Sequence, residues 1–163
     1  MGKRSDFPRH PRDDYATPAE AFAPLIRFLD KRTIIEPCPG AGKLIKHMRK
    51  AGFEVVGVEA DARVQDYRTQ LDIQFVTNPP WTREILHAIL VNLSDQAPTW
   101  LLMDADWMHL ACAKPYLNRL RVIVSVGRVQ WFEGSPSTGK DNSAWYRFER
   151  PDRRAHTRFH GRA

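Results

Sequence analysis

Residues 75–81 read Phe-Val-Thr-Asn-Pro-Pro-Trp, an apolar run that ends in an amide, two prolines and an aromatic ring. The side-chain oxygen of Asn78 and the backbone carbonyl of Pro79 are two acceptors for the two hydrogens of a planar amine. Proline suits this place because it fixes φ and has no N–H, so the direction of its carbonyl is built in. Two such acceptors localise the lone pair of the amine, and Trp81 can stack on its ring. The segment predicts chemistry on an exocyclic amine; the alternative is a stiff turn with Trp81 in the core.

Residues 34–42, upstream, read Ile-Ile-Glu-Pro-Cys-Pro-Gly-Ala-Gly and have the composition of a ligand-binding turn. Gly40 and Gly42 let the backbone turn tightly beside a ligand, and the helix predicted to follow points free N–H groups at an anionic end. Glu59 ends the next predicted strand at the spacing of an acid that binds ribose hydroxyls. Asp66 follows at a place where a side chain could meet an adenine ring.

Two nucleotide cofactors compete for this turn. A dinucleotide site requires Gly-x-Gly-x-x-Gly, but its third glycine is replaced here by Ile45, and Glu36 would put a carboxylate near a pyrophosphate. An acid at this place suits a cofactor with a cationic end, such as the amino group and sulfonium of S-adenosylmethionine. The pattern therefore favours the methyl donor over a nicotinamide cofactor.

The hydrophobic periodicity of the chain indicates which elements hold the two segments. It predicts strands at residues 33–36, 54–59, 73–77, 99–103, 121–126, 129–132 and 144–149, and helices at 17–29, 41–51, 83–93 and 107–117. This order indicates a doubly wound, mostly parallel α/β sheet with an antiparallel C-terminal edge. In such a sheet ligands bind beyond the carboxyl ends of the strands, so residues 36–42 and 78–81 are expected to meet.

The composition indicates one catalytic domain with basic ends. The chain has 163 residues, 25 Lys+Arg against 19 Asp+Glu, a net charge of +6 and two cysteines. We expect a flexible basic arm at residues 1–14, a catalytic domain at 15–149 and a basic tail at 150–163, with both ends disordered until they meet phosphate. The partner predicted is nucleic acid, most simply DNA. No membrane span, disulfide or metal site is expected, and the predicted location is cytoplasmic.

The two motifs resemble those of a known family. Asn78-Pro79-Pro80-Trp81 resembles the (Asn/Asp/Ser)-Pro-Pro-aromatic motif of the amino-methyltransferases, and asparagine at its head resembles the adenine-N6 branch rather than the cytosine-N4 branch. Glu36-Pro37-x-x-Gly40-x-Gly42 resembles the first cofactor motif of that family. Tyr15-Ala16-Thr17-Pro18 resembles the segment that closes over the methionine part of the cofactor. The resemblance covers about residues 15–149, with the cofactor motif before the catalytic one.

The resemblance implies a Rossmann-like class I methyltransferase that uses S-adenosylmethionine to methylate the N6 amine of adenine in DNA. It implies catalytic roles for Asn78, Pro79, Pro80 and Trp81, and cofactor contacts for Tyr15, Thr17, Glu36, Pro37, Gly40, Gly42, Glu59, Asp66 and Asn78. A separate target-recognition domain, which many relatives carry, is not expected, so DNA would be read with low selectivity by loops such as 134–142 and by the basic ends. Three alternatives stay open: the same chemistry on RNA adenine, the same chemistry on a protein glutamine, and a non-catalytic nucleic-acid-binding module.

Overall fold

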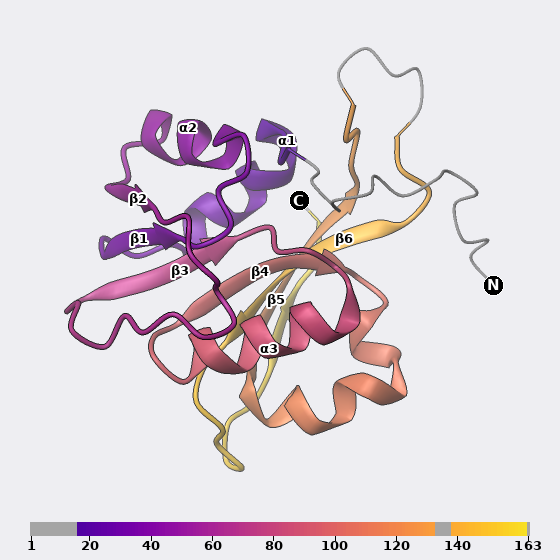
Figure 1. The fold of residues 1–163 in the computed structure, drawn as a ribbon. Helices are drawn as coiled ribbons and strands as arrows, with labels where there is room; N and C mark the ends of the chain where they lie inside the picture. The colour runs from indigo at the N-terminus through magenta and orange to yellow at the C-terminus, as the bar shows by residue number, and fades with distance from the viewer. Residues whose placement is uncertain (1–15, 133–137, 163) are drawn as a thin grey trace.

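The computed structural model describes residues 16–132 and 138–162, and within them the strands form one seven-stranded sheet of order β2-β1-β3-β4-β6-β5-β7 (Figure 1). In chain order the elements are α1 (Ala19–Phe22), η1 (Ala23–Phe28), β1 (Thr33–Glu36), α2 (Lys43–Lys50), β2 (Val55–Gly57), β3 (Ile73–Thr77), α3 (Arg83–Ser94), β4 (Thr99–Asp104), η2 (Trp107–His109), η3 (Ala111–Arg119), β5 (Leu120–Arg128), β6 (Asn142–Phe148) and β7 (Arg158–His160), where η marks 3-10 helices.

The pairing of the strands places a switch point in the sheet. β1 pairs in parallel with β2 on one side and with β3 on the other, and β4 continues the parallel half beside β3. β6 lies antiparallel between β4 and β5. The prediction of a doubly wound, mostly parallel sheet with an antiparallel C-terminal part is confirmed, and the crevice between the carboxyl ends of β1 and β3 is where ligands bind in such sheets.

Helices cover both faces of the sheet, and each face has its own core. One core packs α1, η1 and α2 against the sheet around Trp100 and Trp145, and the indole N–H of Trp145 donates to the Ala21 carbonyl at 2.8 Å. The other core packs α3 and the 3-10 helices η2 and η3 around Phe75 and Trp107. In Figure 1 the first group lies above the sheet and the second below and in front of it.

The helix predicted at residues 17–29 is broken by Pro24. α1 ends at Phe22 and continues as the 3-10 helix η1, with Pro24 in its first turn. Because proline has no N–H, it cannot donate the bond that would continue the α-helix. The helix predicted at 107–117 is likewise two 3-10 helices, with Pro115 inside the second.

Three predictions about the strands need correction. Residues 54–59 were expected to form a buried strand, but β2 is an edge strand in which Val56 is 44% exposed. Residues 121–126 and 129–132 were expected as two strands; β5 instead runs through to Arg128 over a bulge at Gly127, and residues 129–132 form no strand. The C-terminal tail is not a disordered arm, because β7 pairs in parallel with β5.

The glycine turn before α2 depends on a left-handed backbone. Gly42 is the N-cap of α2 and has a φ of 71°. A Cβ there would meet nothing within 4 Å, so a side chain would destabilise the protein through backbone strain and not through a steric clash with neighbouring residues. This conformation also explains why α2 begins at Lys43, two residues later than predicted.

We expect Gly42→Ala to lower the free energy of unfolding by about 1–2 kcal/mol, because a left-handed residue with a Cβ costs that much. Gly42→Asn should cost less, since asparagine tolerates this conformation. Gly161→Ala, at an open position without a positive φ, is the control and should change nothing. Thermal unfolding of the three variants measures this; equal losses for alanine and asparagine at position 42 would contradict the explanation.

Candidate active site

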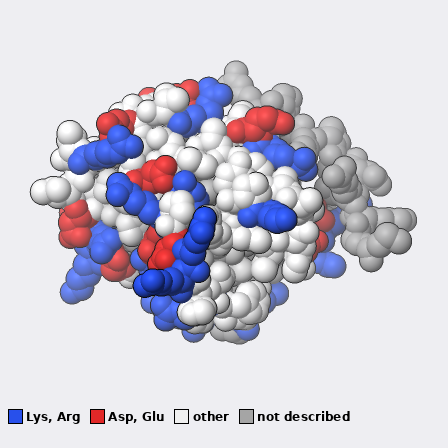
Figure 2. Space-filling model, turned by 90° about the horizontal axis from the view of Figure 1, so that it is seen from below, with Lys and Arg blue, Asp and Glu red and all other residues white. Residues whose placement is uncertain are grey.

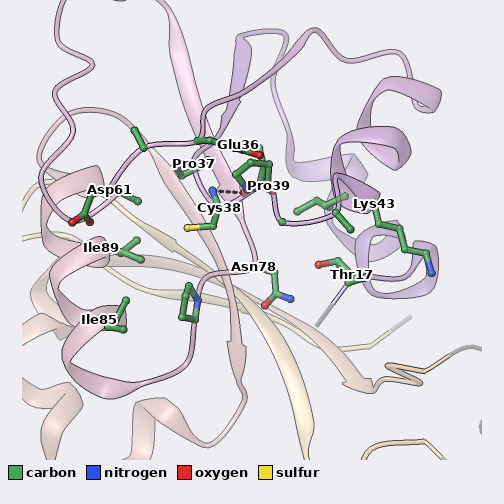
Figure 3. Close-up of a pocket in the computed structure, with 18 of the residues that line it drawn as sticks. Thr17, Glu36, Pro37, Cys38, Pro39, Lys43, Asp61, Asn78, Ile85 and Ile89 are labelled. Atoms are coloured by element: carbon green, nitrogen blue, oxygen red, sulfur yellow. Dashed lines mark hydrogen bonds between the residues drawn. The ribbon is translucent and has the colours of Figure 1, made fainter. Parts of the chain in front are cut away.

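A cavity of about 720 Å³ opens at the switch point, beyond the carboxyl ends of β1, β2 and β3. Its walls come from the segment before α1, the turn after β1, the loop after β2, the turn after β3 and one side of α3 (Figure 3). The volume lies in the range of small-molecule sites. The cavity therefore joins the two segments that the sequence singled out, although 36 residues or more separate them along the chain.

Glu36 is the buried acid of this cavity. It is the last residue of β1 and only 1% exposed, and one of its carboxylate oxygens accepts a hydrogen bond from the Cys38 amide at 3.0 Å. Burial raises the pKa of Glu36 to about 8, against smaller opposite effects of Thr77 and the Cys38 amide. A buried carboxyl of this kind holds its proton near neutral pH and ionises readily when a cationic group binds beside it.

The turn after Glu36 brings backbone and small side chains to the cavity wall. Gly40 has a φ of 47° and lines the cavity, whereas Gly42 shapes the turn without lining it. Burial raises the pKa of the Cys38 thiol to about 12, with a further contribution from Glu36, so this thiol stays protonated. Lys43, at the start of α2, adds a positive charge at the rim of the cavity (Figure 3).

Ile45, which stands where a dinucleotide motif has its third glycine, packs against β2. A Cβ added to Gly57 of β2 would lie 2.6 Å from the Cδ1 atom of Ile45. The small residue that lets helix and sheet approach therefore lies on β2, and Ile45 of α2 fills the space above it. This arrangement differs from the dinucleotide motif and agrees with the choice of cofactor made from the sequence.

The far end of the cavity is an apolar slot. Ala62, Ile85 and Ile89 line it, and the two isoleucines are one helical turn apart on α3. Beside the slot Asp61 accepts two hydrogen bonds from the Arg63 guanidinium, at 2.8 and 2.7 Å. The slot has the apolar walls and polar edge that a planar heterocycle requires.

The loop that carries Ala62 is fixed by two side-chain amides, one on α3 and one in the turn after it. The Asn92 side-chain amide donates to the carbonyls of Ala62 and Gln65, each at 3.0 Å. Gln96 accepts from the Tyr67 amide at 2.6 Å and donates to the Gln65 carbonyl at 3.0 Å. These bonds hold the wall of the slot in place although the loop forms no strand or helix.

The turn after β3 brings Asn78 to the same cavity. Asn78 and Pro80 line it, while Pro79 is buried beside them. Trp81 is partly buried and does not line the cavity; its indole N–H donates to the Leu102 carbonyl of β4 at 3.1 Å. Its ring meets Trp131 edge to face, with centroids 5.9 Å apart. Trp81 is thus held at the sheet edge beside the cavity and is not part of the core.

The structure brings together most of the residues predicted for the site. Those that line the cavity are Thr17, Glu36, Pro37, Gly40, Glu59, Asn78 and Pro80. Asp66 does not line it: its carboxylate accepts from the Arg68 amide and pairs with Arg68 at the surface. Tyr15 lies outside the described residues.

Sequence reasoning missed Lys43, Asp61, Arg63 and the slot on α3. Ile85 and Ile89 are spaced one helical turn apart, but Ile89 is itself only 2% exposed and shares the core with Leu86 and Leu90, so their spacing predicts core packing as well. No sequence signal distinguishes the two pairs. Asp61 lies in a loop, outside any helix or strand. Only the folded structure shows that Asp61, and not Asp66, lines the cavity.

The part of the chain that the structure describes was compared with two further classes of protein, metal-binding and membrane-spanning, and has the features of neither. No cluster of three or more His, Cys, Asp or Glu side chains suited to a metal ion occurs there. None of the helices within residues 16–132 and 138–162 has the length and apolar character needed to cross a membrane.

Comparison with known proteins gives structural neighbours only. No protein-family model matches the sequence, and no curated protein matches it significantly. A modification subunit ascribed to a type I restriction enzyme of Vibrio vulnificus is similar, with a TM-score of 0.53 and 12% identity over 88% of this chain and 45% of that one. A chain of a type I restriction-modification system has a TM-score of 0.54 and 15% identity over 91% and 45%. The chain spans less than half the length of these neighbours, and the likeness confirms the predicted Rossmann-like methyltransferase fold.

Proposed function

We propose that this protein transfers a methyl group from S-adenosylmethionine to the exocyclic N6 amine of adenine in DNA. One observation carries the proposal: Glu36 and Asn78, at the ends of two neighbouring parallel strands, line one cavity at the switch point of the sheet. A carboxylate suited to a cationic ligand thus lies beside an amide suited to a planar amine. The fold that the chain shares with a modification subunit and with another chain of type I restriction systems supports the same reading.

The residues of the cavity fit S-adenosylmethionine from end to end. Glu36 would bind its amino group, and Lys43 at the N-terminus of α2 would face its carboxylate. Glu59, which lines the cavity just after β2, would accept hydrogen bonds from the ribose hydroxyls. The apolar slot on α3 would take the adenine ring. The cofactor would supply an electrophilic methyl group on a cationic sulfur.

The target amine would be activated by Asn78 and its neighbour. The Asn78 side-chain oxygen and the Pro79 carbonyl would each accept one hydrogen of the amine, which draws the nitrogen toward tetrahedral geometry. Its lone pair then forms the new N–C bond as the S–C bond breaks, and the amine loses one proton to solvent. Trp81, held by its bond to Leu102, would pack against a base that has left the stack.

Parallel transfer assays test the substrate. The protein is incubated with S-adenosylmethionine labelled in the methyl group and with duplex DNA, single-stranded DNA, RNA or a glutamine-containing peptide. We expect label in DNA that is released as N6-methyladenine on nucleoside analysis. Label only in RNA or in the peptide would reject the substrate, and cofactor binding without transfer to any of the four would favour a non-catalytic module.

A further inference from the structure

The carboxyl ends of β5 and β7 lie on the same edge of the sheet as Asn78. β5 is antiparallel to β6, which is antiparallel to β4, so β5 and its parallel neighbour β7 point the same way as β3. Arg128 ends β5, and Arg162 follows β7 by two residues. In Figure 1 the C-terminus accordingly lies at the upper edge of the sheet, whereas the turn between β6 and β7 lies at the bottom. Pairing of β7 thus brings an arginine from the chain end to the edge that holds the cavity.

A glycine makes room for this arginine. Gly127 lies at the bulge of β5 with a φ of 88°, and a Cβ there would lie 3.0 Å from a terminal nitrogen of the Arg162 guanidinium. Arg162 therefore packs across the backbone at the end of β5, next to Arg128. Both arginines are exposed, and within residues 16–132 and 138–162 neither forms a salt bridge with an acid.

Two tryptophans in contact with each other follow β3 and β5, on the side of the sheet where these strands have their carboxyl ends. Trp131 follows Arg128 by three residues, and its ring meets that of Trp81, which is bonded to β4 beside Asn78. The edge of the sheet that holds Asn78 therefore also carries two indole rings in contact and two arginines. Aromatic rings beside unpaired positive charges are the combination with which proteins bind bases and phosphates of a nucleic-acid strand.

The opposite end of the sheet is also rich in arginine, but there the charges are mixed. Arg147 pairs with Glu149 at 2.9 Å, and Arg121 lies 3.8 Å from the same carboxylate. The turn after β6 carries Arg153 and Arg154, which are exposed. Figure 2, viewed from below, shows basic and acidic side chains next to one another over much of this face. The number of arginines therefore does not distinguish the two ends. Among the residues that the structure describes, they differ in that Arg128 and Arg162 form no salt bridge, whereas Arg121 and Arg147 do.

We propose that Arg128 and Arg162 bind phosphates of the nucleic-acid strand whose base enters the cavity. β3 and β5 are three strand spacings apart, about 15 Å, which corresponds to roughly four base pairs of duplex rise. The contacts would hold the backbone a few nucleotides from the target and carry no sequence information. The proposal rests on the proposed function for the identity of the substrate.

Binding of fluorescently labelled DNA, measured without cofactor over a range of salt concentrations, tests this surface. The double variant Arg128→Ala/Arg162→Ala should bind at least tenfold more weakly than wild type at low salt. The slope of log affinity against log salt should fall by about 1.5 to 2, because each lost phosphate contact removes nearly one unit. The lysine double variant at the same two positions should keep most of the slope, since it keeps the charge.

The matched control is Arg153→Ala/Arg154→Ala, which removes the same charge from the other end of the sheet. It should bind DNA within about twofold of wild type. Equal losses in the two double variants, or no loss at positions 128 and 162, would overturn the proposal. Wild-type protein that binds DNA through these arginines but does not methylate it would refute the proposed function alone, whereas methylation that is insensitive to both arginines would refute only this surface.

Discussion

Asn78→Ala should reduce methyl transfer by about 10²–10³-fold or more, which is the loss seen when one preorganised hydrogen-bonding group is removed from a reacting centre. The side chain lines the cavity at the end of β3, where it would accept a hydrogen of the amine only as the transition state forms. The Kd for S-adenosylmethionine should stay within about threefold of the wild-type value, because Glu36, Glu59 and the slot on α3 are unchanged. Single-turnover transfer to DNA and calorimetry with the cofactor measure the two effects separately.

The control for this variant is Asn118→Ala, an exposed asparagine near the amino end of β5. It should transfer at the wild-type rate. Full activity of Asn78→Ala would refute the role of the amide. A parallel loss of cofactor affinity would mean that Asn78 holds the cofactor and does not activate the amine.

Glu36→Gln should make the free protein more stable above neutral pH and at the same time weaken cofactor binding by at least a hundredfold. Burial raises the pKa of Glu36 from 4.5 to about 8. Between these values the folded state keeps the proton that the unfolded state releases, so the free energy of unfolding falls as pH rises. A difference of this size corresponds to roughly 4–5 kcal/mol above pH 8, and glutamine does not incur it.

Thermal unfolding at several pH values measures the first half of this prediction. The melting temperature of Glu36→Gln should exceed that of wild type by roughly 10–20 °C at pH 8.5, and the difference should largely disappear near pH 4, where the carboxyl is mostly protonated in both states. Glu54→Gln, an exposed acid outside the cavity, is the control and should leave the curve unchanged. A variant that is less stable than wild type at every pH would show that Glu36 is a structural group.

The sequence was sufficient to predict those strands whose apolar residues are also buried in the folded protein. β1 and β3 have the predicted bounds, because their β-branched runs are buried on both faces of the sheet. The placement of Glu36 and Asn78 followed from these two strands and the rule that ligands bind at their carboxyl ends. Both residues can therefore be identified from the sequence alone.

The features that the sequence did not predict depend on contacts between distant segments. Residues 158–160 have no strong strand pattern, and they form β7 because β5 offers an unpaired edge and His160 packs on Phe28, with ring centroids 4.7 Å apart. Asp66 was expected to reach the cavity and Asp61 was not considered, because the amides of Asn92 and Gln96, which lie far along the chain, fix the position of this loop. Contacts between segments that lie far apart in the chain produce no hydrophobic periodicity within either segment, so the sequence does not predict them.

A crystal structure of the protein with S-adenosylhomocysteine tests the shared cavity most directly. The account predicts that the amino group of the ligand lies within hydrogen-bond distance of Glu36, that its adenine lies between Ala62 and Ile89, and that its sulfur faces Asn78. A ligand bound elsewhere, or bound in this cavity with its sulfur turned away from the asparagine, would contradict it.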